Sequence, residues 1–153
     1  MFTLSDIIDL AIRIEENGGK TYRKAMSEVA DPRLSAMLKR LADDELEHVK
    51  WFETLKSRIK PSGISPALDE MGRSMLRDVL GDRAFSISEA DFTSLQHMKE
   101  LLDISIDFEK DTIIFYEMIS SFVEDEATLK ALAEIIEEEK SHVSLLRETF
   151  EKI

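Results

Sequence analysis

Two copies of a glutamate–histidine pair are the residues of this sequence best suited to chemistry. Glu45 and His48 form one Glu-x-x-His motif, and Glu139 and His142 form the other. On an α-helix, residues three apart lie on one face, so each motif presents a carboxylate and an imidazole about one turn apart. Both groups are ligands of transition metals. One copy of so short a motif is weak evidence in an acidic helical protein, but two copies at corresponding positions indicate a shared site.

Two further glutamates lie in apolar surroundings. Glu15 directly follows Ile14, and Glu109 directly follows Phe108. A glutamate beside a core-facing stripe costs free energy unless it is paired, protonated or bound to metal. With the two motifs, these residues give four glutamates and two histidines. This set matches the ligands of a dinuclear carboxylate site built inside a helical bundle.

Metal binding would also balance the charge of such a cluster. Four ionised glutamates carry four negative charges, which two divalent ions cancel. Without metal, some of the carboxylates would have to be protonated. Carboxylates with a few imidazoles suit iron or, alternatively, manganese, because tetrahedral zinc favours more nitrogen or sulfur ligands. The alternative interpretation is a bundle with acidic surface helices and two core histidines.

Two tyrosines follow the inward glutamates at a fixed distance. Tyr22 lies seven residues after Glu15, and Tyr116 lies seven residues after Glu109. Seven residues make about two helical turns, so each tyrosine shares a helix face with its glutamate. Each phenol is therefore either a hydrogen-bond donor to a ligand carboxylate across the bundle or an ordinary core tyrosine.

Long amphipathic helices are needed to position these residues. The Asp31-Pro32 pair separates the first two helices, with Asp31 as N-cap and Pro32 at the first helical position. Apolar residues at helical spacing predict four helices, at about 4–29, 32–60, 92–123 and 126–152.

The second half of the sequence repeats the first at an offset of 94 residues, without a gap. The offset maps Glu45 onto Glu139 and His48 onto His142. Two similar helical hairpins joined by a long crossover predict an all-α four-helix bundle. We expect one domain over residues 1–153, with a short helix at 67–80 inside the crossover. Its parts are the first hairpin at about 3–60, the crossover at about 61–91 and the second hairpin at about 92–153.

The composition excludes several classes of protein. The chain has 153 residues, with 20 Lys and Arg against 32 Asp and Glu, and a net charge of −12. This balance argues against nucleic acid and anionic membranes as partners. The lack of cysteine excludes disulfides, iron–sulfur clusters and thiolate catalysis. Because there is neither a long apolar run nor a secretory signal, we expect a cytoplasmic protein.

The segments that hold these residues resemble the rubrerythrin branch of the ferritin-like superfamily. The resemblance covers both hairpins and lies in residues 11–22 (AIRIEENGGKTY), 41–48 (LADDELEH), 108–116 and 137–142. It implies a di-iron site in which Glu45 and Glu139 bridge the two ions, while Glu15 and Glu109 each bind one. The implied ligand set is Glu15, Glu45, His48, Glu109, Glu139 and His142.

The sequence departs from that family in two respects. Rubrerythrins carry a cysteine-rich rubredoxin domain that delivers electrons, and this chain has no cysteine. They also carry an additional glutamate one turn after the third-helix ligand, where this chain has Thr112. We therefore expect a stand-alone ferritin-like protein whose electron donor is another molecule.

The resemblance also implies carboxylates that support the histidines. Asp44 and Glu138 each precede a bridging glutamate. In relatives, a carboxylate at this position accepts the free N–H of the histidine on the opposite hairpin and fixes its tautomer. We expect Asp44 to pair with His142 and Glu138 with His48. The alternative is that both are solvated helix acids.

The predicted function is that of a non-haem di-iron carboxylate oxidoreductase, either a peroxidase or a ferroxidase, that reacts with H2O2 or O2. The alternatives are an iron-binding, storage or delivery protein with little turnover, or a bundle with a structural dinuclear site. The expected partners are the small oxidant, an external electron donor and, by resemblance, a second copy of the chain in a homodimer.

Overall fold

The computed structural model describes residues 3–58, 70, 73 and 95–152. They form four long α-helices: α1 (Leu4–Glu28), α2 (Pro32–Arg58), α5 (Leu95–Ser120) and α6 (Glu126–Lys152). The crossover at 61–91 and the short helix expected at 67–80 lie outside the described residues, apart from two isolated positions.

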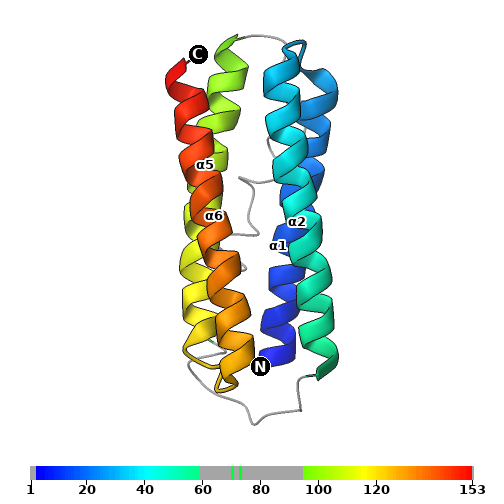
Figure 1. The fold of residues 1–153 in the computed structure, drawn as a ribbon, viewed down its shortest axis with the longest axis vertical. Helices are drawn as coiled ribbons and strands as arrows, with labels where there is room; N and C mark the ends of the chain where they lie inside the picture. Colours follow the sequence, from blue (N-terminus) through cyan, green and yellow to red (C-terminus); the bar gives the residue numbers. More distant parts are fainter. Residues whose placement is uncertain (1–2, 59–69, 71–72, 74–94, 153) are drawn as a thin grey trace.

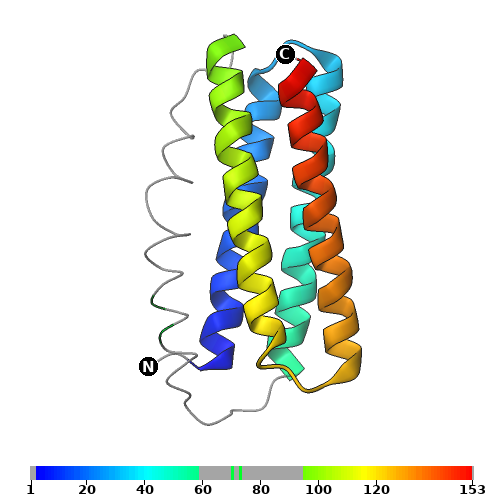
Figure 2. The ribbon, with the colours of Figure 1, turned by 90° about the vertical axis from the view of Figure 1, so that its left-hand side faces the viewer.

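The four helices run side by side as a bundle of two hairpins (Figure 1). α1 packs along α2, and α5 packs along α6. The view turned by a quarter rotation shows the same parallel alignment of the four helix axes (Figure 2). The predicted fold class is confirmed: the described residues contain helices and no strand. None of these helices is long and apolar enough to cross a membrane.

The helix ends follow the capping residues in the sequence. Thr3 and Asp6 form a capping box at the start of α1. Asp31 accepts a hydrogen bond from the backbone N–H of Arg33 at 2.9 Å, which caps α2 at the predicted position. Asp125 accepts the N–H of Thr128 at 2.9 Å and caps α6 in the same way.

The predicted end of the third helix was wrong by three residues. We predicted the helix to Val123, but α5 ends at Ser120. The N–H groups of Ser121 and Phe122 bond to the carbonyls of Met118 and Ile119, three residues back rather than four. The chain therefore tightens into a turn before the α6 cap, which apolar periodicity alone does not reveal.

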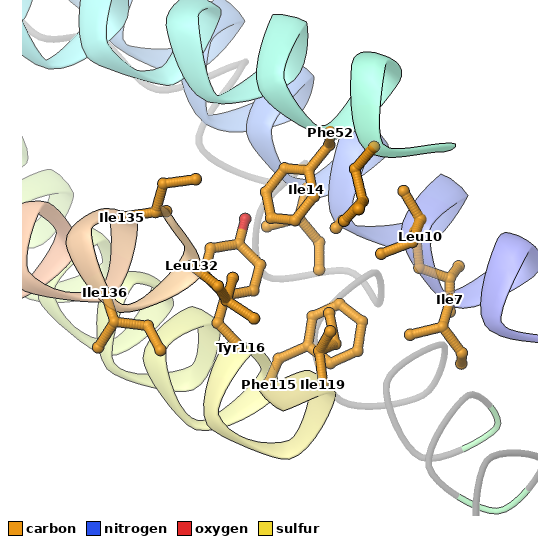
Figure 3. Packing of buried hydrophobic residues seen from close by; sticks show 13 residues of the cluster. Ile7, Leu10, Ile14, Phe52, Phe115, Tyr116, Ile119, Leu132, Ile135 and Ile136 are labelled. Atoms are coloured by element: carbon orange, nitrogen blue, oxygen red, sulfur yellow. The ribbon is translucent and has the colours of Figure 1, made fainter. Parts of the chain in front are cut away.

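The apolar core consists of two clusters at different levels of the bundle. One cluster includes Ile14, Phe52, Tyr116 and Leu132, and part of it is shown in Figure 3. The other is built around Tyr22, Leu38, Leu102 and Leu146. In each helix the two levels are separated along the chain by the Glu-containing segment. The core is therefore interrupted by a polar layer, and this layer contains the candidate site.

Candidate metal centre

All six predicted ligands come together in the middle of the bundle. Each side chain is at most 3% exposed. They form two overlapping groups, and within each group one ligand atom per residue lies within 4.8 Å of the others. The first group contains Glu15 and His48, the second contains Glu109 and His142, and both contain Glu45 and Glu139. Two glutamates are thus placed where both groups can share them.

The histidine rings present one nitrogen to the carboxylates and the other to the outside of the cluster. Nδ1 of His48 lies 2.9 Å from Oε1 of Glu139 and 3.3 Å from Oε1 of Glu15. Nδ1 of His142 lies 3.4 Å from Oε2 of Glu139, 3.5 Å from Oε1 of Glu45 and 3.8 Å from Oε1 of Glu109. Both Nδ1 atoms therefore point into the cluster of carboxylate oxygens.

The outward ring nitrogens contact the two supporting carboxylates. Nε2 of His48 lies 2.6 Å from Oε2 of Glu138, and Nε2 of His142 lies 2.9 Å from Oδ2 of Asp44. Each contact joins one hairpin to the other, in the pairs that the resemblance implied. A carboxylate that accepts the Nε2–H leaves Nδ1 as the lone-pair nitrogen, which is the tautomer that a metal ligand needs.

The cluster contains buried polar atoms that have no hydrogen-bond partner. Seven side-chain atoms are in this state, and every one of the six residues contributes at least one: Glu15 Oε2, Glu45 Oε1, His48 Nδ1, Glu109 Oε2, Glu139 Oε1 and Oε2, and His142 Nδ1. Unsatisfied buried polar atoms cost free energy and are rare in folded proteins. Here all seven are lone-pair donors on residues that converge, so the donor set fits divalent cations.

Both tyrosines hydrogen-bond across the bundle to the inward glutamates. The Tyr22 hydroxyl, from α1, donates to Oε1 of Glu109 on α5 at 2.8 Å. The Tyr116 hydroxyl, from α5, donates to Oε1 of Glu15 on α1. Each phenol occupies one carboxylate oxygen and leaves Oε2 free. The tyrosines therefore fix the orientation of the two glutamates and leave their remaining oxygens available as ligands.

When no metal is present, the surroundings of the cluster raise the pKa of one glutamate and both histidines, so these groups tend to hold protons. Burial, reinforced by the charge of Glu139, raises the pKa of Glu109 to about 8. Burial opposes a charge on His48, but Glu139 and Glu15 outweigh it and raise the pKa of His48 to about 11. The pKa of His142 is likewise raised to about 11, against the effect of burial, by Glu109 and Glu139. Metal ions entering this cluster must therefore displace protons.

The phenols remain protonated throughout this range. Burial is the largest cause, and the neighbouring carboxylates add to it, so the pKa of both Tyr22 and Tyr116 is raised well above 10. Ser105 is buried beside Tyr22 and partly offsets the rise in its pKa. Sequence reasoning did not select Ser105. The repeat offered no signal for it, since its counterpart is Ala11.

Two positions beside the cluster are occupied by small residues. A methyl group at Gly18 would lie 3.3 Å from Cε1 of Phe108 and 3.4 Å from Oε2 of Glu45, so this glycine permits close packing. Thr112, at the position of the additional family glutamate, is buried and donates its hydroxyl to the carbonyl of Phe108 at 2.8 Å. The side chain of the third histidine, His97, lies outside the described residues.

This fold and this cluster define a class of protein: a ferritin-like four-helix bundle with carboxylates and histidines buried at its centre. Comparisons with known proteins agree with that class. The sequence model of the family described as rubrerythrin matches residues 6–150, so the chain belongs to the rubrerythrin family.

A solved structure gives an independent comparison. The chain is similar to a Thermotoga maritima protein provisionally described as a ferritin-like diiron-carboxylate protein. The TM-score is 0.79 at 27% sequence identity, and the match covers 98% of this chain and 95% of the other. No protein in the curated sequence set matches the chain.

Proposed function

We propose that this protein binds two iron ions in its central cluster and acts as an oxidoreductase that reduces H2O2 or O2. The observation that carries the proposal is the set of seven unpartnered lone-pair atoms on six converging side chains. Membership of the rubrerythrin family and the likeness to a protein described as diiron-carboxylate support iron over manganese.

The roles of the side chains follow from their positions. Glu45 and Glu139, shared by both groups, would bridge the two ions, and Glu15 and Glu109 would each bind one. When bound, two ferrous ions would supply the two electrons that, with two protons, reduce H2O2 to two water molecules. The chain contributes buried side chains that are shielded from bulk water, and two of them, Glu109 and Glu15, are held in orientation by Tyr22 and Tyr116.

A second candidate function is iron binding or delivery with little turnover. Thr112 favours it, because this hydroxyl is committed to a backbone carbonyl where the family pattern has another carboxylate. The ligand set then holds four glutamates, and position 112 supplies no fifth carboxylate. A purely structural metal site is the remaining alternative.

Rapid mixing distinguishes these functions. We expect the anaerobic ferrous protein to oxidise within seconds of mixing with H2O2 or O2 and to return to the ferrous form when an electron donor is added. Iron that binds tightly but oxidises no faster than free Fe²⁺ would favour delivery or a structural site instead. The same experiment with Mn²⁺ tests the choice of metal.

The carboxylates behind the histidines give a sharper test of the site. We expect Glu138→Gln or Asp44→Asn to weaken metal affinity by about 10–100-fold, because the outward N–H of the ring loses its charged acceptor. Calorimetric titration with Fe²⁺ under anaerobic conditions measures the change.

Glu137→Gln is the matched control. Glu137 is an exposed glutamate on the same helix, and its partner is Lys140 at 3.3 Å. Its loss should leave the affinity unchanged. Equal effects of Glu137→Gln and Glu138→Gln would show that general acidity of α6, and not support of His48, governs binding.

A further inference from the structure

A column of aromatic rings leads from the surface of α2 to the buried cluster. Trp51 packs edge-on against Phe52 with ring centroids 5.0 Å apart, and Phe52 lies 5.1 Å from Tyr116. The Tyr116 hydroxyl then donates to Glu15. Figure 3 shows Phe52 from α2 and Tyr116 from α5 reaching toward each other through the apolar core. The column thus ends on one of the proposed ligands.

The column is present on one side of the repeat only. Trp51 and Phe52 correspond to Leu145 and Leu146 at the offset of 94 residues. Leu146 is fully buried in the other core cluster, where it takes the corresponding position of its own hairpin without an aromatic ring. Among the described residues, the other tyrosine, Tyr22, makes no ring contact of this kind. Core packing therefore does not require aromatic residues at these positions, and the column needs another explanation.

The two ends of the column differ in their access to solvent. Trp51 is half-buried and lines a small surface pocket of about 80 Å3 together with Leu55, Arg58 and Thr128. Tyr116 is fully buried. Trp51 is also the single tryptophan of the chain, and the chain has only two tyrosines and no cysteine. Tryptophan and tyrosine are the side chains that lose one electron most readily when cysteine is absent.

We propose that Trp51, Phe52 and Tyr116 form a path for single electrons between the protein surface and the buried site, an inference that rests on the proposed redox function. When H2O2 accepts electrons at the site, Tyr116 would give one of them, and its phenolic proton would move along the hydrogen bond to Glu15. Trp51 then gives an electron to the Tyr116 radical through the intervening ring of Phe52, and the proton returns from Glu15 to the phenol. A one-electron carrier outside the protein reduces the Trp51 radical. The net change is the movement of one electron inward.

Pulse radiolysis with azide radicals tests the path in the full-length chain, with Zn²⁺ added so that the site holds no redox-active ion. Azide radicals oxidise Trp51, which is the accessible oxidisable ring, to its neutral radical. With no external carrier to reduce Trp51, the electron should use the same path in the outward direction, so we expect this radical to be replaced by a tyrosyl radical in a first-order step. Tyr116 loses an electron to Trp51 and a proton to Glu15, and Trp51 regains its proton from water. Transient absorption separates the two radicals, and the readout does not depend on iron binding or on turnover.

Matched variants locate the path. Tyr116→Phe keeps the ring and should abolish the tyrosyl radical, while Tyr22→Phe should leave its yield and rate unchanged. Phe52→Leu, which introduces the residue type found at the corresponding Leu146, should slow the transfer severalfold.

The proposal is overturned if the tyrosyl radical survives Tyr116→Phe, or if its rate of formation rises with protein concentration. An unchanged rate in Phe52→Leu would remove Phe52 from the path. Circular dichroism confirms that each variant is folded, and the Tyr116 and Tyr22 pair decides the outcome even if Phe52→Leu does not fold.

Discussion

Loading with Fe²⁺ under anaerobic conditions should raise the melting temperature of the chelated protein by roughly 8–16 °C. Ions that bind the folded cluster and not the unfolded chain stabilise by mass action, which gives about 4 kcal/mol when the free metal exceeds its Kd a thousandfold. They also satisfy the seven unpartnered atoms and relieve repulsion between the buried carboxylates. Mn²⁺ should produce a shift in the same direction.

Substitution of a ligand should remove most of this increment. His48→Ala and Glu139→Ala each delete a group that lies in the cluster, and Glu139 belongs to both ligand groups. Glu47→Ala is the control, since this neighbour of His48 is exposed and forms an ion pair with Lys50 at 3.1 Å. The quantity to compare is the difference between loaded and chelated protein within each variant. If this difference is the same in the parent, in His48→Ala and in Glu47→Ala, the histidine is not a ligand.

Glu109→Gln should change protein stability in opposite directions with and without metal. In chelated protein, the pKa of Glu109 is raised from 4.5 to about 8. A carboxyl whose folded pKa is raised loses stability as pH rises from its unfolded pKa through its folded one. Ionisation of Glu109 should therefore destabilise the folded chain progressively between about pH 4.5 and pH 8, by up to roughly 5 kcal/mol. Glutamine cannot ionise, so the chelated variant should be the more stable protein above pH 8.

With iron bound, the order should reverse, because glutamine lacks the negative charge that a metal ligand supplies. Chemical denaturation at pH 5.5 and pH 9, with chelator and with Fe²⁺, measures both effects. Glu117→Gln on the exposed face of α5 serves as the control and should show neither effect. Chelated Glu109→Gln that loses stability with rising pH as steeply as the parent would contradict the raised pKa.

The helices and their pairing could be predicted because several independent signals agree. Apolar periodicity, the Asp31-Pro32 boundary and the 94-residue repeat all point to two hairpins. The end of α5 could not be predicted in the same way. Phe122 and Val123 continue the apolar pattern, and only the backbone hydrogen bonds show that the helix has already tightened into a turn. Periodicity records which face is buried, not where the hydrogen-bond ladder stops.

The candidate site was predictable to the extent that the repeat marks it. Residues with a counterpart at the same offset were selected, including Tyr22 and Tyr116, but the sequence did not specify that Tyr22 pairs with Glu109 and Tyr116 with Glu15. Ser105 and the aromatic column lack such a counterpart. Ser105 and the aromatic column are recognised by contacts between helices that are far apart in the sequence, and the spacing of residues along one helix does not predict such contacts. The role that we propose for Trp51 and Phe52 could therefore not be predicted from the sequence, in which both residues fit the apolar core pattern.

The most direct test of the dinuclear site is the number of iron ions bound per chain. Anaerobic Fe²⁺ titration of chelated protein, followed by desalting and metal analysis, measures this number for the parent and for Glu139→Ala. Our account predicts two ions per chain in the parent and a loss of tight binding when the glutamate common to both groups is removed. A parent that retains one ion or none, or a Glu139→Ala variant that retains two, would contradict it.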